Sequence, residues 1–331
     1  MACRNPATFN YTDKVISISE IDLTDDTCLI GLRADPGILV ASIQAVGLIS
    51  PPVLRQKHDF KYQIVCGFRR VKACQSLGWH EIKVRVLLGE LSEFDLLKLA
   101  IWDNRSHRPL NVIEQAQGIK KLSAHIPAGD RLEVLASILG FPLNQKVFGK
   151  LGKLCRLPES IQTGLRDETI AFEAAVDLCE FSPEDALTFF DLFNGLKLSQ
   201  NKQREIIMLV QEIGIREDLG PGKILRSRDI RMIMDRPELN RNEKGAKLRA
   251  YLKQRRFPEL TQAEERFSKE LKALKLNEHI NVTASPYFER GSYTLRMTFK
   301  NMKDFDKRRE ALDDMAKNPA LRRLLEPFDD K

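Results

Sequence analysis

Two short segments combine residues whose types and spacing could bind a phosphorylated ligand. In the first, the strand-like run 62–66 turns at Gly67 into a helix start that carries Arg69 and Arg70. Glycine permits a tight turn and close approach to a phosphate. A helix N-terminus adds backbone N–H groups and the positive end of a dipole, and guanidinium groups can fork onto phosphate oxygens. The turn therefore predicts an anion site, and the alternative is a solvated basic face.

The second segment, residues 103–116, begins with Asp103 and Asn104. A carboxylate is a hard oxygen ligand able to hold Mg²⁺ between phosphates, and an amide can donate to a phosphate or a ribose. Together the two segments make a triphosphate–magnesium site feasible. The alternative is that the arginines lie on the surface and that Asp103 and Asn104 form a helix C-terminal turn.

The elements that would position the first segment alternate between strands and helices. Short runs in which apolar residues alternate with a period of two predict strands. Apolar residues at helical spacing, followed by Gly47 or Gly78, predict helices that end at these glycines. This mixture predicts a small α+β domain. The expected strands are 15–18, 52–55, 61–66 and 82–87, and the expected helices are 38–46 and 68–77.

From Ser92 onward the sequence predicts helices without strands. Ser92 is expected to cap a helix to about Asn104, and residues 111–114 have the spacing of a capping box. Apolar residues over 131–139, a turn at Gly140 and a second helix over 143–154 predict a helix-turn-helix. The further helices are expected over 158–165, 172–179, from 182 onward, and over 200–213 with a stop at Gly214.

The second helix of this helix-turn-helix carries polar and basic side chains at its N-terminal end, where such helices meet base edges. Basic residues further along suit phosphates. The alternative is an ordinary helical hairpin with exposed polar residues. The candidate base contacts are Asn144, Gln145 and Lys146, and the candidate phosphate contacts are Lys150, Lys153 and Arg156.

The net positive charge of the chain is concentrated in residues 221–256. Twelve Lys and Arg face four Asp and Glu, a net charge of +8, against +7 for the whole chain. The stretch could be a flexible basic linker, helices against DNA phosphates, or a helix with a solvated basic face. Beyond it, a helix over 261–274, strands over 279–283 and 293–299 and a final helix predict a unit that pairs with a second copy.

Bulk properties narrow the classes of protein. The chain of 331 residues can form two or three domains, and a pI near 9.0 favours a polyanionic partner. No apolar run reaches 18 residues and no secretory signal is visible, so a cytoplasmic protein without a membrane span is expected. Six cysteines lack a C-x-x-C pair and are expected as reduced thiols.

The order of these segments resembles the ParB family of bacterial DNA-partition proteins. The family pattern Gly-Glu-Arg-Arg-x-x-Ala lines up with residues 67–73, and Glu-Asn-x-x-Arg-x-x-Leu-Asn-x-x-Glu-x-Ala with residues 103–116. Phe68 replaces the glutamate of the first motif, and His107 replaces the arginine of the second. The resemblance covers roughly residues 14–195, and a weaker one returns near 260–315.

The resemblance implies an α+β protein: a ParB/sulfiredoxin-like nucleotide-binding domain (1–105), a helical helix-turn-helix DNA-binding domain (106–218), a basic linker or helices (219–258) and an αββα dimerisation domain (259–331). It implies a homodimer that binds CTP and Mg²⁺, closes as a clamp around double-stranded DNA and serves chromosome or plasmid partition at the nucleoid, with a partition ATPase as partner. By the same resemblance the nucleotide would contact Pro51, Gly67, Phe68, Arg69, Arg70, Asn104 and Arg108, and the metal would bind Asp103.

Phe68 leaves hydrolysis open, because phenylalanine can orient neither an arginine nor a metal-bound water; no catalytic residue is assigned. In sulfiredoxin this turn holds a nucleophilic cysteine, whereas here Cys66 precedes the turn and is expected in the core. Two alternatives stand beside the CTP clamp. One is a dimeric transcriptional regulator of the same build without nucleotide turnover, and the other is a nucleotide-dependent kinase or nuclease of this fold.

Overall fold

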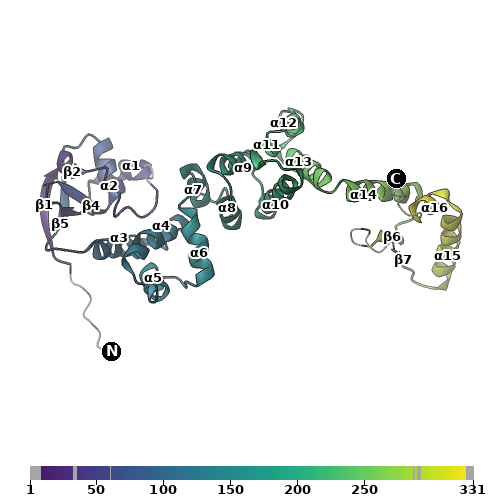
Figure 1. Ribbon diagram of the computed structural model, residues 1–331, viewed down its shortest axis with the longest axis horizontal. Coiled ribbons are helices and arrows are strands. Elements are labelled where there is room, and N and C mark those ends of the chain that lie inside the picture. The colour runs from purple at the N-terminus through teal and green to yellow at the C-terminus, as the bar shows by residue number, and fades with distance from the viewer. Residues whose placement is uncertain (1–8, 33–35, 60, 286–287, 289–291, 326–331) are drawn as a thin grey trace. The chain divides into compact units, whose positions relative to one another are not determined.

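The computed structural model describes residues 9–32, 36–59, 61–285, 288 and 292–325 (Figure 1). The chain divides into two compact units, one up to Arg204 and the other from Glu205. The first contains a five-stranded sheet followed by helices, and the second contains helices and a two-stranded sheet. The predicted α+β class is confirmed. Five of the six cysteines are free thiols, and Cys3 lies outside the described residues.

The five-stranded sheet has the order β1-β5-β3-β4-β2 and mixes parallel with antiparallel neighbours. β1 and β5 are antiparallel, β5 and β3 parallel, β3 and β4 antiparallel, and β4 and β2 parallel. The short β2 was not predicted. The strands are β1 (Tyr11–Ser17), β2 (Ile21–Asp22), β3 (Val53–Gln56), β4 (Tyr62–Cys66) and β5 (Glu81–Leu87).

The core of this domain follows from the alternation in β5, where Ile82, Val84 and Val86 are buried and the residues between them are exposed. Helices α1 (Gly37–Val46) and α2 (Phe68–Ser76) pack their apolar residues into the same cluster. Leu54 and Val71 within it have no exposed surface. Each such side chain contributes about 1.5–3 kcal/mol of hydrophobic stabilisation, so the strand and helix ends that carry polar residues are held firmly.

The helical part of the first unit begins as predicted, at capped N-termini. Ser92 accepts a hydrogen bond from the N–H of Asp95, and Asn111 and Glu114 form a capping box. The helices are α3 (Glu93–His107), α4 (Val112–Leu122), α5 (Arg131–Leu139), α6 (Gln145–Leu154), α7 (Glu159–Arg166), α8 (Phe172–Leu178) and α9 (Pro183–Leu196), with 3-10 turns η1 (Ile18–Glu20) and η2 (Ser123–His125).

The predicted helix end at Gly214 is wrong, and the predicted final helix is interrupted. Helix α10 (Gln200–Glu217) continues through Gly214, and the carbonyl oxygen of Leu219 returns so close that a Cβ at Gly214 would lie 2.8 Å from it. The glycine therefore serves a close approach and does not end the helix. The final helix is divided into α15 (Met302–Lys317) and α16 (Pro319–Leu325), since proline lacks the N–H that would continue α15.

The basic stretch 221–256 is helical, which excludes the flexible linker among the alternatives. It contains α11 (Pro221–Leu225), α12 (Arg228–Met234) and α13 (Arg241–Arg256). After it come α14 (Pro258–Ala273) and the antiparallel pair β6 (Ile280–Ala284) and β7 (Tyr293–Met297). None of the helices in the described part of the chain is long and apolar enough to cross a lipid bilayer.

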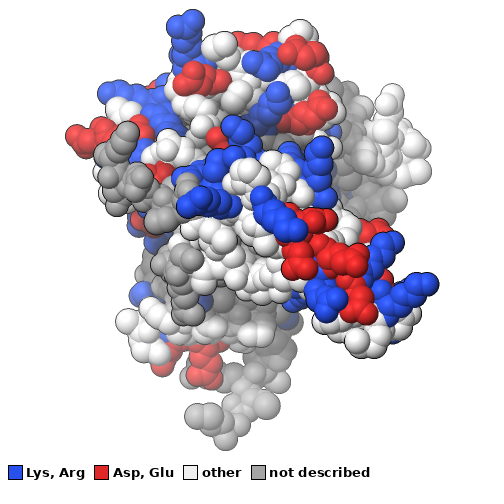
Figure 2. Space-filling model, turned by 90° about the vertical axis from the view of Figure 1, so that its right-hand side faces the viewer, with Lys and Arg blue, Asp and Glu red and all other residues white. Residues whose placement is uncertain are grey.

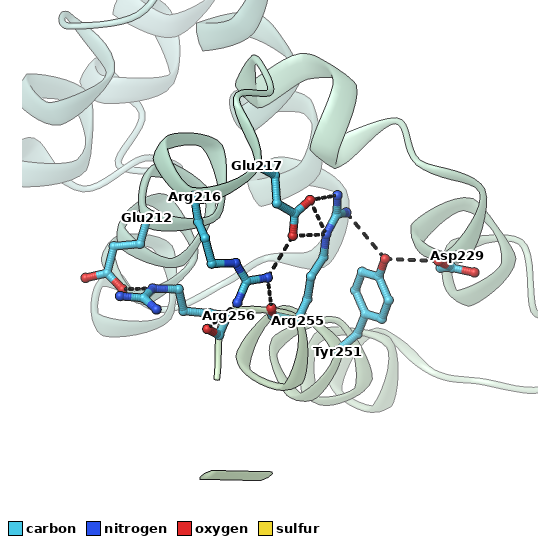
Figure 3. A network of polar contacts seen from close by, with 7 residues as sticks. All are labelled: Glu212, Arg216, Glu217, Asp229, Tyr251, Arg255 and Arg256. Carbon is cyan, nitrogen blue, oxygen red and sulfur yellow. Dashed lines mark hydrogen bonds and ion pairs between the residues drawn. The ribbon is translucent and has the colours of Figure 1, made fainter. Parts of the chain in front are cut away.

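Glutamates of α10 neutralise much of the positive charge of α13. Glu205 accepts from Arg249, and Glu212 accepts from Arg256, each at 2.7 Å. Glu217 is bound by Arg255 from α13 and by Arg216 (Figure 3). The charge of this stretch is therefore partly internal, and on the face drawn in Figure 2 acidic and basic side chains lie next to one another.

Hydrogen bonds from Arg255, which have the larger effect, and from Arg216 lower the pKa of Glu217. The ion pairs of Glu217 therefore stabilise the fold fully above the ordinary carboxyl pKa of 4.5, and this stabilisation is lost as the pH falls through the lowered pKa. Glu217→Gln is expected to lower the melting temperature at pH 7, and this difference should shrink as the pH falls below 4.5. Thermal unfolding across pH measures it. Glu310→Gln is the control: it replaces an exposed carboxylate on α15 by a carboxamide and should leave the melting temperature unchanged.

Candidate functional site

The predicted turn at Gly67 is present at the junction of β4 and α2. Gly67 has φ of 93° and is the N-cap of α2, and no side chain caps the helix there. A Cβ at this position would lie 2.9 Å from Nε of Arg70 and 3.0 Å from Cβ of Pro52. Both the left-handed backbone and the narrow space therefore require glycine at this position.

The guanidinium group of Arg70 joins the two predicted segments. Its Nη1 donates to the carbonyl oxygen and the hydroxyl of Ser50, at 2.9 and 2.7 Å, and to the carbonyl oxygen of Pro51 at 3.2 Å. Its Nη2 lies 3.5 Å from Oδ2 of Asp103. The glycine–arginine turn and the start of the second segment are thus adjacent. Arg70 holds the Ser50–Pro51 loop against them.

Asp103 and Asn104 lie inside α3, which continues to His107, so the predicted helix end near Asn104 is wrong. Helical spacing directs Asp103 toward α2, and its side chain is about one-third exposed. The amide Nδ2 of Asn104 donates to the carbonyl oxygen of Ala100, one turn earlier. A continuous helix holds the carboxylate more rigidly than a C-terminal turn would, because its backbone is bonded on both sides.

Arg108 is bound by a buried carboxylate. Its two terminal nitrogens donate to Glu114 at 2.7 and 2.6 Å, and these hydrogen bonds raise the pKa of Arg108. Glu114 also accepts from the N–H of Asn111 and packs its Cγ close to Gly31. In this arrangement Arg108 closes the α3–α4 connection. Its assignment to a nucleotide stays a prediction.

Phe68 and Arg69, next to the turn, face different surroundings. Phe68 is half-buried and packs against the core cluster of the sheet, whereas Arg69 is exposed. Cys66 is buried, and burial, followed by the charge of Asp103, raises the pKa of its thiol. The thiol therefore stays protonated at neutral pH and packs in the core, as predicted.

The described residues contain no group of three or more His, Cys, Asp and Glu side chains that could hold a metal ion. Asp103 offers a single carboxylate, and Arg70 already lies beside it. A magnesium ion here would need phosphate oxygens and water to complete its six ligands. The residues fit a metal that arrives with a polyphosphate and do not fit a metal site made by the protein alone.

Helices α5 and α6 occupy the residues predicted to form a helix-turn-helix, and α5 ends at Gly140, which has φ of 77° (Figure 1). Their role as a helix-turn-helix stays a prediction. Helix α6 begins at Gln145 and not at Leu143 as predicted, because the side chain of Asn144 caps it by accepting from the N–H of Val147 at 2.9 Å. Leu151 and Leu154 are buried and Val147 is half-buried. The apolar stripe therefore fixes which face of α6 is exposed.

Some of the candidate DNA-contacting side chains are exposed, and others already form ion pairs within the protein. Asn144, Gln145 and Lys146 are exposed at the N-terminal end of α6, and Arg156 is exposed beyond its C-terminal end. Two basic residues are paired within the protein: the Nζ atoms of Lys150 and Lys153 lie 2.5 Å and 2.6 Å from the carboxylates of Glu173 and Glu180, respectively. A phosphate would have to replace these glutamates.

Arg105, which the sequence did not single out, links α3 to the helix-turn-helix. Its Nη1 donates to the carbonyl oxygens of Ser137 and Ile138 at 3.2 Å each, at the C-terminal end of α5. The guanidinium group covers Gly140, where a Cβ would lie 2.1 Å from its Cζ. The only signal in the sequence was a basic residue in the last turn of a helix, which is too common to be informative.

Gly140→Ala is expected to lower the free energy of unfolding by about 1–2 kcal/mol, because alanine is strained at φ of 77° and its methyl group displaces Arg105. Gly149→Ala is the matched control in α6, where nothing lies within 4 Å of the added Cβ. This replacement should raise the free energy of unfolding by up to about 1 kcal/mol. Chemical denaturation measures both changes. A free energy of unfolding that is the same in Gly140→Ala as in the unmodified protein would contradict the packing of Arg105 over Gly140.

Comparison with known proteins gives a family match within the sheet-containing domain. Residues 37–105 match the family model of the ParB N-terminal domain. A nucleoid occlusion protein of Oceanobacillus iheyensis is 31% identical over 170 residues, 50% of this chain and 57% of the relative. That of Bacillus thuringiensis is 32% identical over 148 residues, 44% and 49% of the two chains. The chain spans about half the length of the curated relatives it matches.

Solved structures with some likeness include ParB of Caulobacter crescentus complexed with CTP-gamma-S, 22% identical, covering 55% of this chain and 98% of that one with a TM-score of 0.26. The same protein complexed to the centromeric parS site is 21% identical, with 57% and 96% covered and a TM-score of 0.33. Likeness at these scores supports no argument about this chain. On the family match, residues 37–105 are a ParB N-terminal domain, and the resemblance to the ParB family drawn from the two motifs is confirmed.

Proposed function

We propose that this protein is a dimeric, sequence-specific DNA-binding protein of the ParB kind whose N-terminal domain binds CTP with Mg²⁺. The observation that carries the proposal is the distance of 3.5 Å between Arg70 and Asp103, which joins the two motif segments beside the uncapped start of α2. By the family match and the named relatives, its role would be chromosome or plasmid partition or nucleoid occlusion, at the nucleoid in the cytoplasm.

In the nucleotide pocket each side chain would have a separate task. The exposed guanidinium of Arg69 would bind phosphate oxygens at the start of α2, where the helix dipole also favours an anion. Arg70 would hold the Ser50–Pro51 loop in contact with the ligand. Asp103 would share a magnesium ion with the phosphates, and Asn104 would donate to the ligand after leaving Ala100. Bound Mg²⁺ would neutralise part of the phosphate charge.

On the DNA side, α6 would enter the major groove with its N-terminal end. Asn144, Gln145 and Lys146 are exposed there, and Asn and Gln side chains suit adenine while Lys suits guanine or phosphate. Lys150 and Lys153 would exchange their glutamates for phosphates on binding. Such an exchange makes affinity depend strongly on salt concentration.

Dimerisation would use the second unit. β6 and β7 form a sheet of two strands; Leu295 on β7 is 43% exposed, and Phe299, beyond the end of β7, is 52% exposed. Two strands are marginal alone, so a second copy would complete the sheet or cover these two side chains. A partition ATPase as partner is also part of the proposal and rests on the family resemblance alone.

Titration of the purified full-length protein with CTP, ATP and GTP in the presence of Mg²⁺ tests the nucleotide site. We expect CTP to bind with a Kd below 1 mM, about −4.1 kcal/mol, with or without DNA. If none of the three nucleotides binds below this concentration, the clamp is excluded. Binding of a DNA library at several salt concentrations tests the helix-turn-helix separately.

A second candidate is a dimeric transcriptional regulator of the same build without nucleotide turnover. Phe68 favours it, because its ring packs into the core where the family motif has a carboxylate. CTP binding without phosphate release would support a nucleotide-bound state that does not reset by hydrolysis. Release of phosphate at a rate that depends on DNA would support the clamp.

A further inference from the structure

A small apolar cavity lies beside the Gly67 turn, on the side where Phe68 points. It has a volume of about 150 Å³. Its wall combines side chains from the loop after β2, from β4 and from α2. Ile64 in this wall is buried, whereas Leu23, Leu29, Leu32 and Phe68 are half-buried. The apolar lining residues are Leu23, Leu29, Leu32, Ile64 and Phe68.

The size and lining of the cavity fit one ring or one branched aliphatic group. The cavity opens to solvent at its polar rim, and its inner wall of Leu, Ile and Phe side chains, with a volume of about 150 Å³, can take a benzene-sized guest. Phe68 offers an aromatic face or edge for an offset or edge-to-face contact with a ring. A nucleoside triphosphate is far too large for this space.

Cationic side chains stand at the rim. Arg69 and Lys72, one turn of α2 apart, line the cavity together with Gln75, and none of the described residues that line it is acidic. The cavity also opens beside the N-terminal end of α2, whose dipole favours negative charge. An apolar body inside the cavity would therefore place an anionic head group near Lys72.

The loop that forms one wall is held firmly by α4. Nζ of Lys121 donates to the carbonyl oxygens of Asp26, Thr27 and Leu29, which uses all three of its protons. Burial lowers the pKa of Lys121. Because Leu29 is fixed in this way, the cavity keeps its wall in the absence of a ligand, and little ordering has to occur on binding.

From these observations we propose that this cavity is a binding site for a small anion with an apolar body, an aromatic or branched aliphatic carboxylate. The ring or alkyl group lies against Phe68 and the leucines, and the carboxylate lies toward Lys72. The site does not depend on CTP binding, since it uses the apolar side of the turn and Lys72, whereas Arg69 is the residue proposed to bind the nucleotide phosphates. The residue that departs from the ParB motif, Phe68, would select this ligand.

The test uses 4-fluorobenzoate as the probe and the full-length protein, observed by ¹⁹F NMR line broadening. We expect binding with a Kd of about 1 mM, consistent with the burial of a single ring. The neutral probe 4-fluorobenzyl alcohol should bind about fivefold more weakly, because it lacks the charge that pairs with the rim. Absence of broadening of either probe at 10 mM, roughly tenfold above the expected Kd, would overturn the proposal.

Variants separate the cavity from non-specific binding. Leu29→Phe fills the cavity and should abolish the line broadening of the probe. Lys72→Gln removes an exposed charge at the rim and should weaken the binding of 4-fluorobenzoate about fivefold without weakening the binding of 4-fluorobenzyl alcohol. Lys83→Gln on β5 is the matched control, since Lys83 is exposed and lies outside the cavity lining. If Leu29→Phe does not fold, Lys72→Gln still decides. Equal effects of Lys72→Gln and Lys83→Gln, or displacement of the probe by saturating CTP, would overturn a separate anion site.

Discussion

Arg70→Ala is expected to weaken CTP binding about 10- to 100-fold, the loss that follows when charge-assisted hydrogen bonds worth about 1.5–3 kcal/mol disappear. Arg70 makes three hydrogen bonds to Ser50 and Pro51 and lies beside Asp103. Without it the Ser50–Pro51 loop loses its attachment to α2, and Asp103 loses its neighbouring positive charge. Isothermal titration with CTP and Mg²⁺ measures the loss.

Arg70→Lys separates geometry from charge, because lysine keeps the positive charge but cannot donate in the planar fork of arginine. We expect it to recover only a small part of the affinity. Arg85→Ala is the matched control in the same domain, since Arg85 is exposed on β5 and pairs with the exposed Asp13 at 3.7 Å. CTP affinity that is unchanged in Arg70→Ala would remove Arg70 from the site, and equal losses in Arg70→Ala and Arg85→Ala would indicate a general effect on folding.

Leu154→Ala is expected to lower the free energy of unfolding by about 2–5 kcal/mol, because Leu154 has no exposed surface and its removal leaves a cavity under α6. Sequence-specific DNA binding should fall with it, since α6 would lose the contact that sets its orientation. Urea denaturation and a DNA-binding assay at constant salt concentration measure the two effects.

Lys146→Ala provides the contrast on the same helix. Lys146 is exposed, so its replacement should change the free energy of unfolding by less than about 0.5 kcal/mol. Specific DNA affinity should nevertheless fall by about 1–3 kcal/mol if the side chain contacts a base edge. Specific binding that survives Lys146→Ala with its salt dependence unchanged would mean that another element contacts the DNA.

Local chemistry made several features predictable from the sequence. Gly67 and Gly140 have the left-handed backbone expected of a turn, and Ser92 and Asn111 cap the helices that they precede. Alternation in β5 identified its buried side. These features depend on residues within one turn or one strand of each other, so the order of residue types is sufficient to predict them.

Contacts between distant residues were decided by the tertiary structure. Gly214 looked like a helix end, but the returning Leu219 makes it a point of close approach within a longer helix. Residues 221–256 looked like a surplus of free positive charge, but the carboxylates that pair with three arginines of α13 come from α10, about 40 residues earlier. Sequence spacing cannot reveal which charges meet after folding.

By itself, the amino-acid sequence determined the α+β class, the two motif segments and the pair of helices on either side of Gly140, because each rests on short-range periodicity, capping or turn chemistry. Only the tertiary structure decided that Arg70 reaches both Ser50 and Asp103, that Arg105 covers Gly140, and that Phe68 lines a cavity. Those outcomes depend on how the sheet and helices pack, since side chains far apart in sequence meet only when hydrophobic burial brings their elements together.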